Sequence, residues 1–389
     1  MIIIVKLTTD CNLRCVYCSE GDKPPRILSL EYIYKMIDEL PAFLDSLNDR
    51  NVTLLWHGGE PMTVGTHYLR KVMTYAKEKL AGYGLRFEMQ SNLTLLNDEW
   101  IELIKEFQIR MGVSLDGYRE LHDANRRTKD GNPTFDLVMK NLDRLNSEGI
   151  RYGTLMVLNT AAPVDVDQLY DFIKERKLHI KIHAVVPCGR AAGNLHSGEI
   201  YNRYIAILES LYEKTIGDMD FEGTIDPTDG LLKSILSGVP VNECAYNGNC
   251  GQKFFCLYST GEFGFCGRAE SVISGFGYGH IKDHSLFEIY HSQHADSIRD
   301  RQEFLASNGC GHCPDWKLCH GGCAFEALNA YGELNVKYPN CESRRSFIRY
   351  LKTTGLTLLK KRLVMERKKY RIAIKSRKEI LKELSHDGE

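Results

Sequence analysis

Residues 2–18 read IIIVKLTTDCNLRCVYC, an apolar run followed closely by a loop with three cysteines. The run IIIVKL predicts a strand. Cys11, Cys15 and Cys18 follow at C-x3-C-x2-C spacing, and Tyr17 stands just before the last of them. The stretch therefore predicts a strand whose carboxyl end carries three thiols close together.

The pattern of this first strand recurs along the first half of the chain. Apolar runs alternate with helical patterns, and several helices begin at a capping residue such as Ser29 or Asn97. The runs that predict strands are IIIVKL (2–7), VTLLWHG (52–58), LRFEMQS (85–91), RMGVSL (110–115), YGTLMVL (152–158) and HIKIHAVVP (179–187). Six strands, each followed by a helix, predict an α/β fold, a partial (β/α)6 barrel of the TIM type.

Polar motifs follow the first four of these strands. The three-thiol loop follows the first strand, and HGGEP (57–61), QSNLTLL (90–96) and SLDG (114–117) lie at the ends of the next three. Because a barrel of this kind carries its chemistry at the carboxyl ends of its strands, we expect these motifs to form one site.

Composition limits the class of protein. The 389-residue chain has a net charge of -1, which argues against a protein that binds nucleic acid through its overall charge. It shows no apolar run of transmembrane length and no signal peptide, so we expect a cytoplasmic protein with no membrane partner. Thirteen cysteines are many for a reducing compartment, where clustered thiols indicate metal binding rather than disulfides.

Three thiols on one loop leave a four-coordinate metal centre incomplete. The spacing suits three irons of a [4Fe–4S] cluster, whose fourth iron then stays open to a substrate or cofactor. Two alternatives remain, a zinc site that takes a distant fourth ligand and three unrelated thiols.

The CNLRCVYC motif resembles the signature of the radical S-adenosylmethionine (SAM) superfamily. In that superfamily the open iron binds the amino and carboxylate groups of SAM, and an electron from the cluster cleaves SAM to methionine and a 5'-deoxyadenosyl radical. HGGEP is similar to the superfamily's GGEP motif, which meets the methionyl amino group. Arg126, in HDANRRTKDGNPTFD, falls on an arginine that pairs with the SAM carboxylate. The resemblance implies that SAM contacts Tyr17, Gly58, Gly59, Glu60, Ser91, Asn92, Ser114, Arg126 and Val157.

Nine further cysteines lie between Cys244 and Cys341. Their spacing resembles the SPASM domain, which holds two auxiliary [4Fe–4S] clusters with interleaved ligands. The resemblance implies that Cys244, Cys250, Cys266 and Cys323 bind one auxiliary cluster, and that Cys310, Cys313, Cys319 and Cys341 bind the other. Structural zinc sites are the alternative. Cys188 and Cys256 are left over; packing is the favoured role for each, although Cys188 could face the active site and Cys256 could replace a ligand.

The sequence predicts four parts: a radical SAM barrel (1–215), a linker (216–240), a small cysteine-rich SPASM domain (241–345) and a basic helical tail (346–389). The SPASM part shows little periodicity, and we expect it to bury little apolar core and to depend on metal. From Tyr350 onward the chain carries twelve Lys and Arg against five Asp and Glu. This tail could bind an acidic leader peptide, although a solvated helix packed on the SPASM domain is the preferred interpretation.

SPASM proteins mostly modify peptides or proteins. We expect an oxidoreductase that abstracts a side-chain hydrogen from a ribosomally made precursor peptide and forms a cross-link or an oxidised residue. Sulfatase maturation, which forms formylglycine, and oxidation of a small molecule are the alternatives, and a non-catalytic scaffold is a different class. Sulfatase maturases carry an aspartate directly after the cysteine that matches Cys266, whereas Gly267 and Arg268 follow here. No general base is identifiable. Expected partners are the peptide and an electron donor such as flavodoxin or ferredoxin. A separate leader-binding protein is one way to hold the peptide, since the chain begins on barrel strand one.

Overall fold

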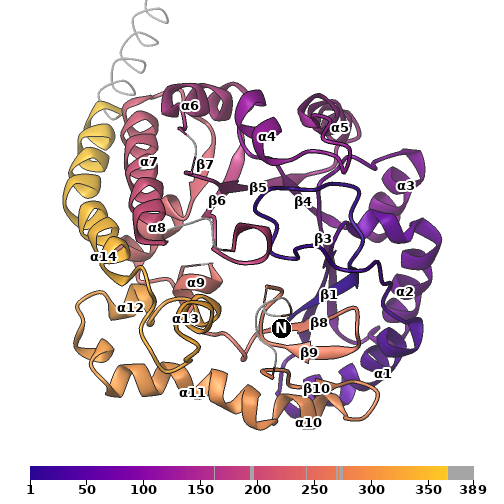
Figure 1. Ribbon diagram of the computed structural model, residues 1–389. Coiled ribbons are helices and arrows are strands. Elements are labelled where there is room, and N and C mark those ends of the chain that lie inside the picture. Colours follow the sequence, from indigo (N-terminus) through magenta and orange to yellow (C-terminus); the bar gives the residue numbers. More distant parts are fainter. Residues whose placement is uncertain (162, 193–196, 242, 269, 271–274, 367–389) are drawn as a thin grey trace, which may run out of the picture.

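The computed structural model describes residues 1–389 except 162, 193–196, 242, 269, 271–274 and 367–389. Figure 1 shows the strands inside a ring of helices. The six predicted strand–helix units are confirmed, with boundaries within a few residues of those expected. The units are β1 (Ile2–Thr8), α1 (Leu30–Ser46), β2 (Asn51–Gly58), α2 (Thr66–Lys79), β3 (Gly84–Ser91), α3 (Asp98–Phe107), β4 (Arg110–Ser114), α4 (Arg119–Asn125), α5 (Phe135–Ser147), β5 (Tyr152–Leu158), α6 (Val166–Glu175), β6 (His179–Ala184) and α7 (Ser197–Gly217).

Strands β1 to β6 pair in parallel with their neighbours in chain order. Ile3, Val5 and Leu7 of β1 are fully buried in the apolar core that the outer helices share. Because side chains alternate along a strand, Lys6 lies on the opposite face and points into the barrel. In the register of β1 and β2 it pairs with His57.

The sheet continues beyond the predicted six strands at both edges. Within the described residues its order is β10-β9-β8-β1-β2-β3-β4-β5-β6-β7. The added strands are β7 (Thr224–Asp226), β8 (Phe254–Leu257), β9 (Glu262–Gly264) and β10 (Gly279–His280). Strand β8 pairs in parallel with β1, so the cysteine-rich part joins the barrel's own sheet. These strands are two to four residues long, and so short a run carries little periodic signal.

The cysteine-rich part also contributes to the main core. The expectation that it buries little apolar surface is wrong, because Phe255, Phe263, Phe265 and Phe325 are buried in the same cluster as the barrel residues. Its helices are α9 (Cys244–Asn247), α10 (Leu286–Tyr290), α11 (Gln293–Ser307), α12 (Trp316–Cys319) and α13 (Ala324–Tyr331). How the chain divides into domains stays a prediction.

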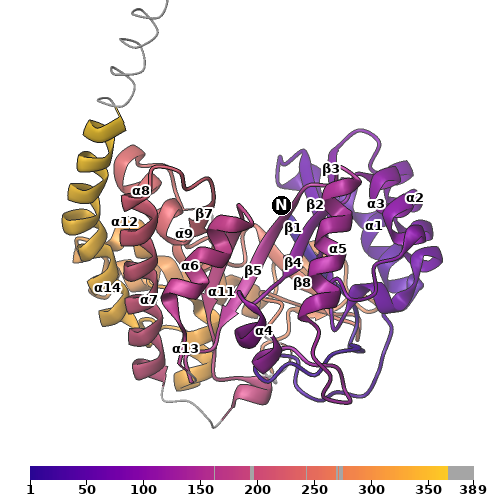
Figure 2. The same cartoon turned by 90° about the horizontal axis from the view of Figure 1, so that it is seen from above.

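The stretch predicted as a linker contains β7 and α8 (Thr228–Ser237). Helix α14 (Cys341–Tyr350) lies beside α7 in both views (Figures 1 and 2). The Tyr350 hydroxyl donates to Glu213 at 3.0 Å, which ties the two helices together. The helical trace continues to residue 366, and the rest of the predicted basic tail lies outside the described residues. No described helix is long and apolar enough to cross a membrane.

Candidate functional site

The three-thiol loop follows β1 and is held by backbone hydrogen bonds. Two of its N–H groups donate to the carbonyl oxygens of Asn125 and Arg127, at 3.0 and 2.7 Å. Burial raises the pKa of Cys11 to about 12 and that of Cys15 to about 11. Cys11 and Cys15 are therefore protonated at neutral pH, and a metal centre bound there displaces their protons.

A second segment, at the end of β6, braces this loop. The Arg190 guanidinium donates to the carbonyl oxygen of Cys15 at 3.1 Å and to the Asp22 carboxylate at 2.7 Å. A Cβ at Gly189, whose φ is +58°, would lie only 2.2 Å from the carbonyl oxygen of Cys18. The glycine thus lets the two segments touch, and the arginine fixes them together.

The glycines of HGGEP serve a similar purpose. A Cβ at Gly58 would lie 2.4 Å from the carbonyl oxygen of Thr8, and one at Gly59 would lie 2.0 Å from that of Asp10. In addition, the Gly59 N–H donates to the Thr8 carbonyl at 2.8 Å. The backbone that needs this space is therefore the chain's own, at the start of the three-thiol loop.

Glu60 joins the loops after β2 and β3. Its buried carboxylate accepts hydrogen bonds from the Ser91 hydroxyl at 2.8 Å and from the backbone N–H groups of Met62 at 3.1 Å and Asn92 at 2.7 Å. Burial raises the pKa of Glu60 to about 7 even though these donors favour the ionised form. Three predicted SAM contacts are thus brought together, and their polar groups already bond to one another.

Asp116 organises three more of the predicted SAM contacts. Its carboxylate accepts from the Tyr17 hydroxyl, from Nε of Arg126 at 2.9 Å and from the backbone N–H of Val157 at 3.1 Å. The Arg126 guanidinium also lies over the Tyr17 ring, 5.4 Å from its centroid. The sequence analysis gave Asp116 no role of its own, although it stands in the SLDG motif.

The barrel interior is polar near the carboxyl ends of the strands. Lys6 and His57 are register neighbours, and the Gln90 amide donates to the Ser114 hydroxyl at 2.9 Å. Burial lowers the pKa of His57 to about 4, so its imidazole is neutral at physiological pH. Packed barrels fill these positions with Val, Ile and Leu, so polar side chains here suit a polar ligand.

A partly buried ring of alternating charges, centred on the buried Lys6, links the loop to the cysteine-rich part. Lys6 contacts the carboxylates of both Glu20 and Glu270, and Lys23 contacts the same two carboxylates at 3.1 and 3.3 Å. Burial alone would lower the pKa of Lys6, but the nearby carboxylates and the Cys256 thiol outweigh it and raise that pKa. The sequence analysis missed this ring, because its members lie up to 264 residues apart.

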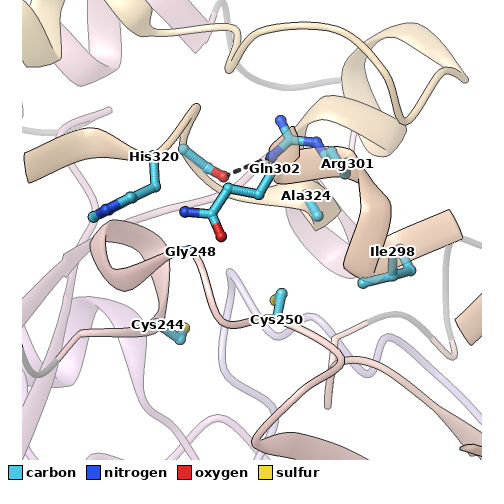
Figure 3. A pocket seen from close by; sticks show the side chains of 9 residues that line it. Cys244, Gly248, Cys250, Ile298, Arg301, Gln302, His320 and Ala324 are labelled. Atoms are coloured by element: carbon cyan, nitrogen blue, oxygen red, sulfur yellow. Dashed lines mark hydrogen bonds between the residues drawn. The ribbon is translucent and has the colours of Figure 1, made fainter. Parts of the chain in front are cut away.

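We call Cys244, Cys250, Cys266 and Cys323 site I. Figure 3 shows Cys244 and Cys250 in the lining of a small hollow. Burial raises the pKa of Cys250, and the Cys244, Cys323 and Cys266 thiols add to that rise. The structure therefore brings these four thiols together from four separate segments.

Arg301, at the hollow's edge, fixes the segment around Cys323 (Figure 3). Its guanidinium donates to the carbonyl oxygens of Gly322 at 3.1 Å and Leu334 at 2.7 Å. Cys266 is held from the other side by the Tyr258 hydroxyl, which donates to its carbonyl oxygen at 2.8 Å. The sequence gave no signal for either contact.

We call Cys310, Cys313, Cys319 and Cys341 site II. Burial raises the pKa of Cys310, and the thiols of Cys319 and Cys313 raise it further; Cys319 acts on Cys341 in the same way. In the part of the chain that the structure describes, no three Cys, His, Asp or Glu side chains converge on a single ion position. Thiols that each bind a different iron of one cluster do not need to converge in that way, so both sets are compatible with a cluster.

The two remaining cysteines are buried. Cys188 is 2% exposed and packs in the main core. Cys256 is fully buried on β8, where the strand register pairs it with Ile4.

The chain is similar to known proteins in three comparisons. Residues 5–173 match the model of the radical SAM superfamily. Over 361 residues the chain is 26% identical to a cysteine-type anaerobic sulfatase-maturating enzyme of Clostridium novyi, covering 89% of this chain and 93% of that enzyme.

Two solved structures share the fold. Native anSMEcpe with bound AdoMet and the Kp18Cys peptide superposes with a TM-score of 0.77 at 22% identity, covering 92% of this chain and 99% of that one. Streptococcus suis SuiB bound to its precursor peptide SuiA gives 0.62 at 16% identity, covering 88% and 75%. The superfamily resemblance is thus confirmed. Residues 5–173 form a radical SAM domain, and over most of its length the chain is similar to a sulfatase-maturating enzyme.

Proposed function

We propose that this protein oxidises a side chain in a peptide or protein substrate by radical SAM chemistry, in the manner of a sulfatase-maturating enzyme. The observation that carries the proposal is the match over nearly the whole length of both chains with such an enzyme. The sequence analysis placed precursor-peptide maturation first and sulfatase maturation second, and this match favours the reverse order.

The superfamily uses SAM and a [4Fe–4S] cluster. In this chain Cys11, Cys15 and Cys18 would hold that cluster, which supplies the electron that cleaves SAM. The proposal assigns two further clusters to site I and site II, each closed by four thiolates.

The chain's own residues orient the reactants. Asp116 fixes the Arg126 guanidinium, which is the proposed partner of the SAM carboxylate. Glu60 fixes the loops that carry Ser91 and Asn92. Neutral His57 and the polar inward face of the barrel offer hydrogen bonds to the substrate segment beside them. Holding the reacting groups in place in this way supplies much of the rate.

A second candidate is maturation of a precursor peptide, by cross-linking or by oxidation. One specific observation favours it: Gly267 and Arg268 occupy the positions after Cys266, where the sulfatase-maturase pattern has an aspartate.

The test incubates the reconstituted, reduced enzyme with SAM and a cysteine-containing sulfatase peptide, and with its serine counterpart. We expect 5'-deoxyadenosine to form, together with a peptide whose mass matches conversion of its cysteine or serine residue to formylglycine. If 5'-deoxyadenosine forms and neither peptide changes, the first proposal fails and the precursor-peptide reading stands. If no 5'-deoxyadenosine forms with any substrate, both fail.

A further inference from the structure

Arg268 lies where the barrel meets site I. Its backbone N–H points to the Cys266 sulfur, 3.4 Å away. Its guanidinium Nη2 lies 3.2 Å from Nδ1 of His183. The positive charge of the guanidinium also acts through space on the Cys244 and Cys323 sulfurs, so it lies near both. One cation is therefore close to three of the four thiols.

A chain of polar contacts holds this arginine in place. His183 accepts from Arg268 at Nδ1, so its Nε2 carries the proton and faces the Glu243 carboxylate at 3.1 Å. Lys181 lies 3.0 Å from the other carboxylate oxygen. Burial would raise the pKa of Glu243, but His183 and Lys181 lower it to well below its usual range. Glu243 is thus ionised and paired with Lys181, and the His183 ring lies between it and the arginine.

We propose that Arg268 raises the reduction potential of a cluster held at site I and so makes that cluster a better acceptor of the substrate's electron. This rests on the proposed function. SAM is the oxidant for hydrogen abstraction, which leaves a carbon-centred radical; the radical then loses one electron to the cluster and one proton to a neighbouring base. The reduced cluster carries one more negative charge than the oxidised one, so a nearby cation stabilises the reduced form.

The sign of the charge distinguishes this chain. In the sulfatase-maturase pattern an aspartate stands directly after the matching cysteine, and its negative charge would disfavour reduction of a cluster, whereas Gly267 and Arg268 stand here. Here the Glu326 carboxylate is the opposing group, since its negative charge acts at Cys323 against the positive charge of Arg268. Removing each side chain should therefore shift the potential in opposite directions.

The experiment is a redox titration of the reconstituted full-length enzyme, followed by the electron paramagnetic resonance of each reduced cluster. We expect Arg268→Gln to lower the midpoint potential of the site I cluster by about 59 mV or more, which is a tenfold change in the one-electron equilibrium constant. Arg268→Lys keeps the positive charge and should leave the midpoint potential of the site I cluster close to that of the parent. Glu326→Gln should raise this potential.

Site II provides the matched control. Arg345 acts on Cys313 and Cys341 as Arg268 acts on site I. Arg345→Gln should therefore lower the midpoint potential of the site II cluster and leave that of site I unchanged. Arg268→Gln should lower the midpoint potential of the site I cluster and leave that of site II unchanged. A variant that merely disturbs the fold would move both.

The iron content of the parent enzyme distinguishes failure of this inference from failure of the assignment of a cluster to site I. If the parent enzyme holds three clusters and Arg268→Gln leaves the site I potential unchanged, the inference is wrong and the proposed function stands. If site I holds no cluster in the parent, the assignment of an auxiliary cluster to site I is wrong as well, and the inference falls with it.

Discussion

The three-thiol loop and site I are built in opposite ways. The loop gathers its thiols within eight consecutive residues. It accepts a hydrogen bond from Arg190 and donates two to the carbonyl oxygens of Asn125 and Arg127. Site I draws Cys244, Cys250, Cys266 and Cys323 from segments spread over about eighty residues. A contiguous set of ligands can be read in the sequence by its spacing alone, whereas a dispersed set exists only once the chain has folded.

The largest expected effect tests whether the two regions are independent. Replacing Cys11, Cys15 and Cys18 together with alanine should abolish SAM cleavage, because the open iron has lost its ligands. The eight thiols of sites I and II are untouched, so about two clusters' worth of iron should remain. Iron analysis and chromatography of 5'-deoxyadenosine measure both outcomes. Loss of all iron together with the fold would contradict the independence of the regions.

The next prediction concerns a variant that breaks the ring of charges joining the two regions. Lys6→Met leaves the partly buried carboxylates of Glu20 and Glu270 with only Lys23 beside them, and should lower the free energy of unfolding by about 3–5 kcal/mol. Lys105→Met is the control, because its pair with Glu148 is exposed and should be worth about 1 kcal/mol or less. Equal destabilisation of the two variants in urea titrations would show that the ring does not tie the regions together.

The same ring gives the protein a pH dependence. Burial would raise the pKa of Glu20, but Lys6 and Lys23 outweigh it and lower that pKa. A carboxyl group with a lowered pKa in the folded state stabilises the fold above its unfolded pKa, and this contribution is lost as the pH falls through the folded value. Parent stability should therefore fall on acidification below about pH 4.5, more steeply than that of a Glu20→Gln variant. Parallel stability curves for the two proteins would contradict this.

Different parts of the molecule were predictable for different reasons. Strands β1 to β6 could be placed because each is five to eight residues long and alternates with a helix of clear period. Strands β7 to β10 could not, because they are too short for a pattern. Strand β8 pairs with β1, which is distant in the chain, and β9 and β10 extend the sheet from β8. The sequence identified Glu60 and Arg126 by their motifs. It did not show that Asp116 holds Arg126, or that Lys6 meets Glu270, since such contacts depend on the fold.

A smaller effect tests how closely the loops of the first region pack. Gly59→Ala places a Cβ about where the carbonyl oxygen of Asp10 lies, and overpacking of this kind should cost about 1–3 kcal/mol of stability. It should also weaken SAM binding, because the three-thiol loop must move. Gly82→Ala is the matched control, since a Cβ there meets no atom within 4 Å. Thermal unfolding and SAM titration of both variants distinguish a local clash from a general effect of alanine.

The central claim is that the three-thiol loop starts the reaction while site I accepts the electron that ends it. Cys266→Ala tests this claim most directly, because it removes one site I ligand and leaves the loop intact. The measurement compares 5'-deoxyadenosine and modified peptide in the same reaction, in deuterated solvent. We expect 5'-deoxyadenosine still to form. The rate of formation of modified peptide should fall at least tenfold, which corresponds to an activation barrier higher by about 1.4 kcal/mol. Deuterium from the solvent should appear in the recovered substrate. Product formation equal to that of the parent would contradict the claim and leave site I a structural element.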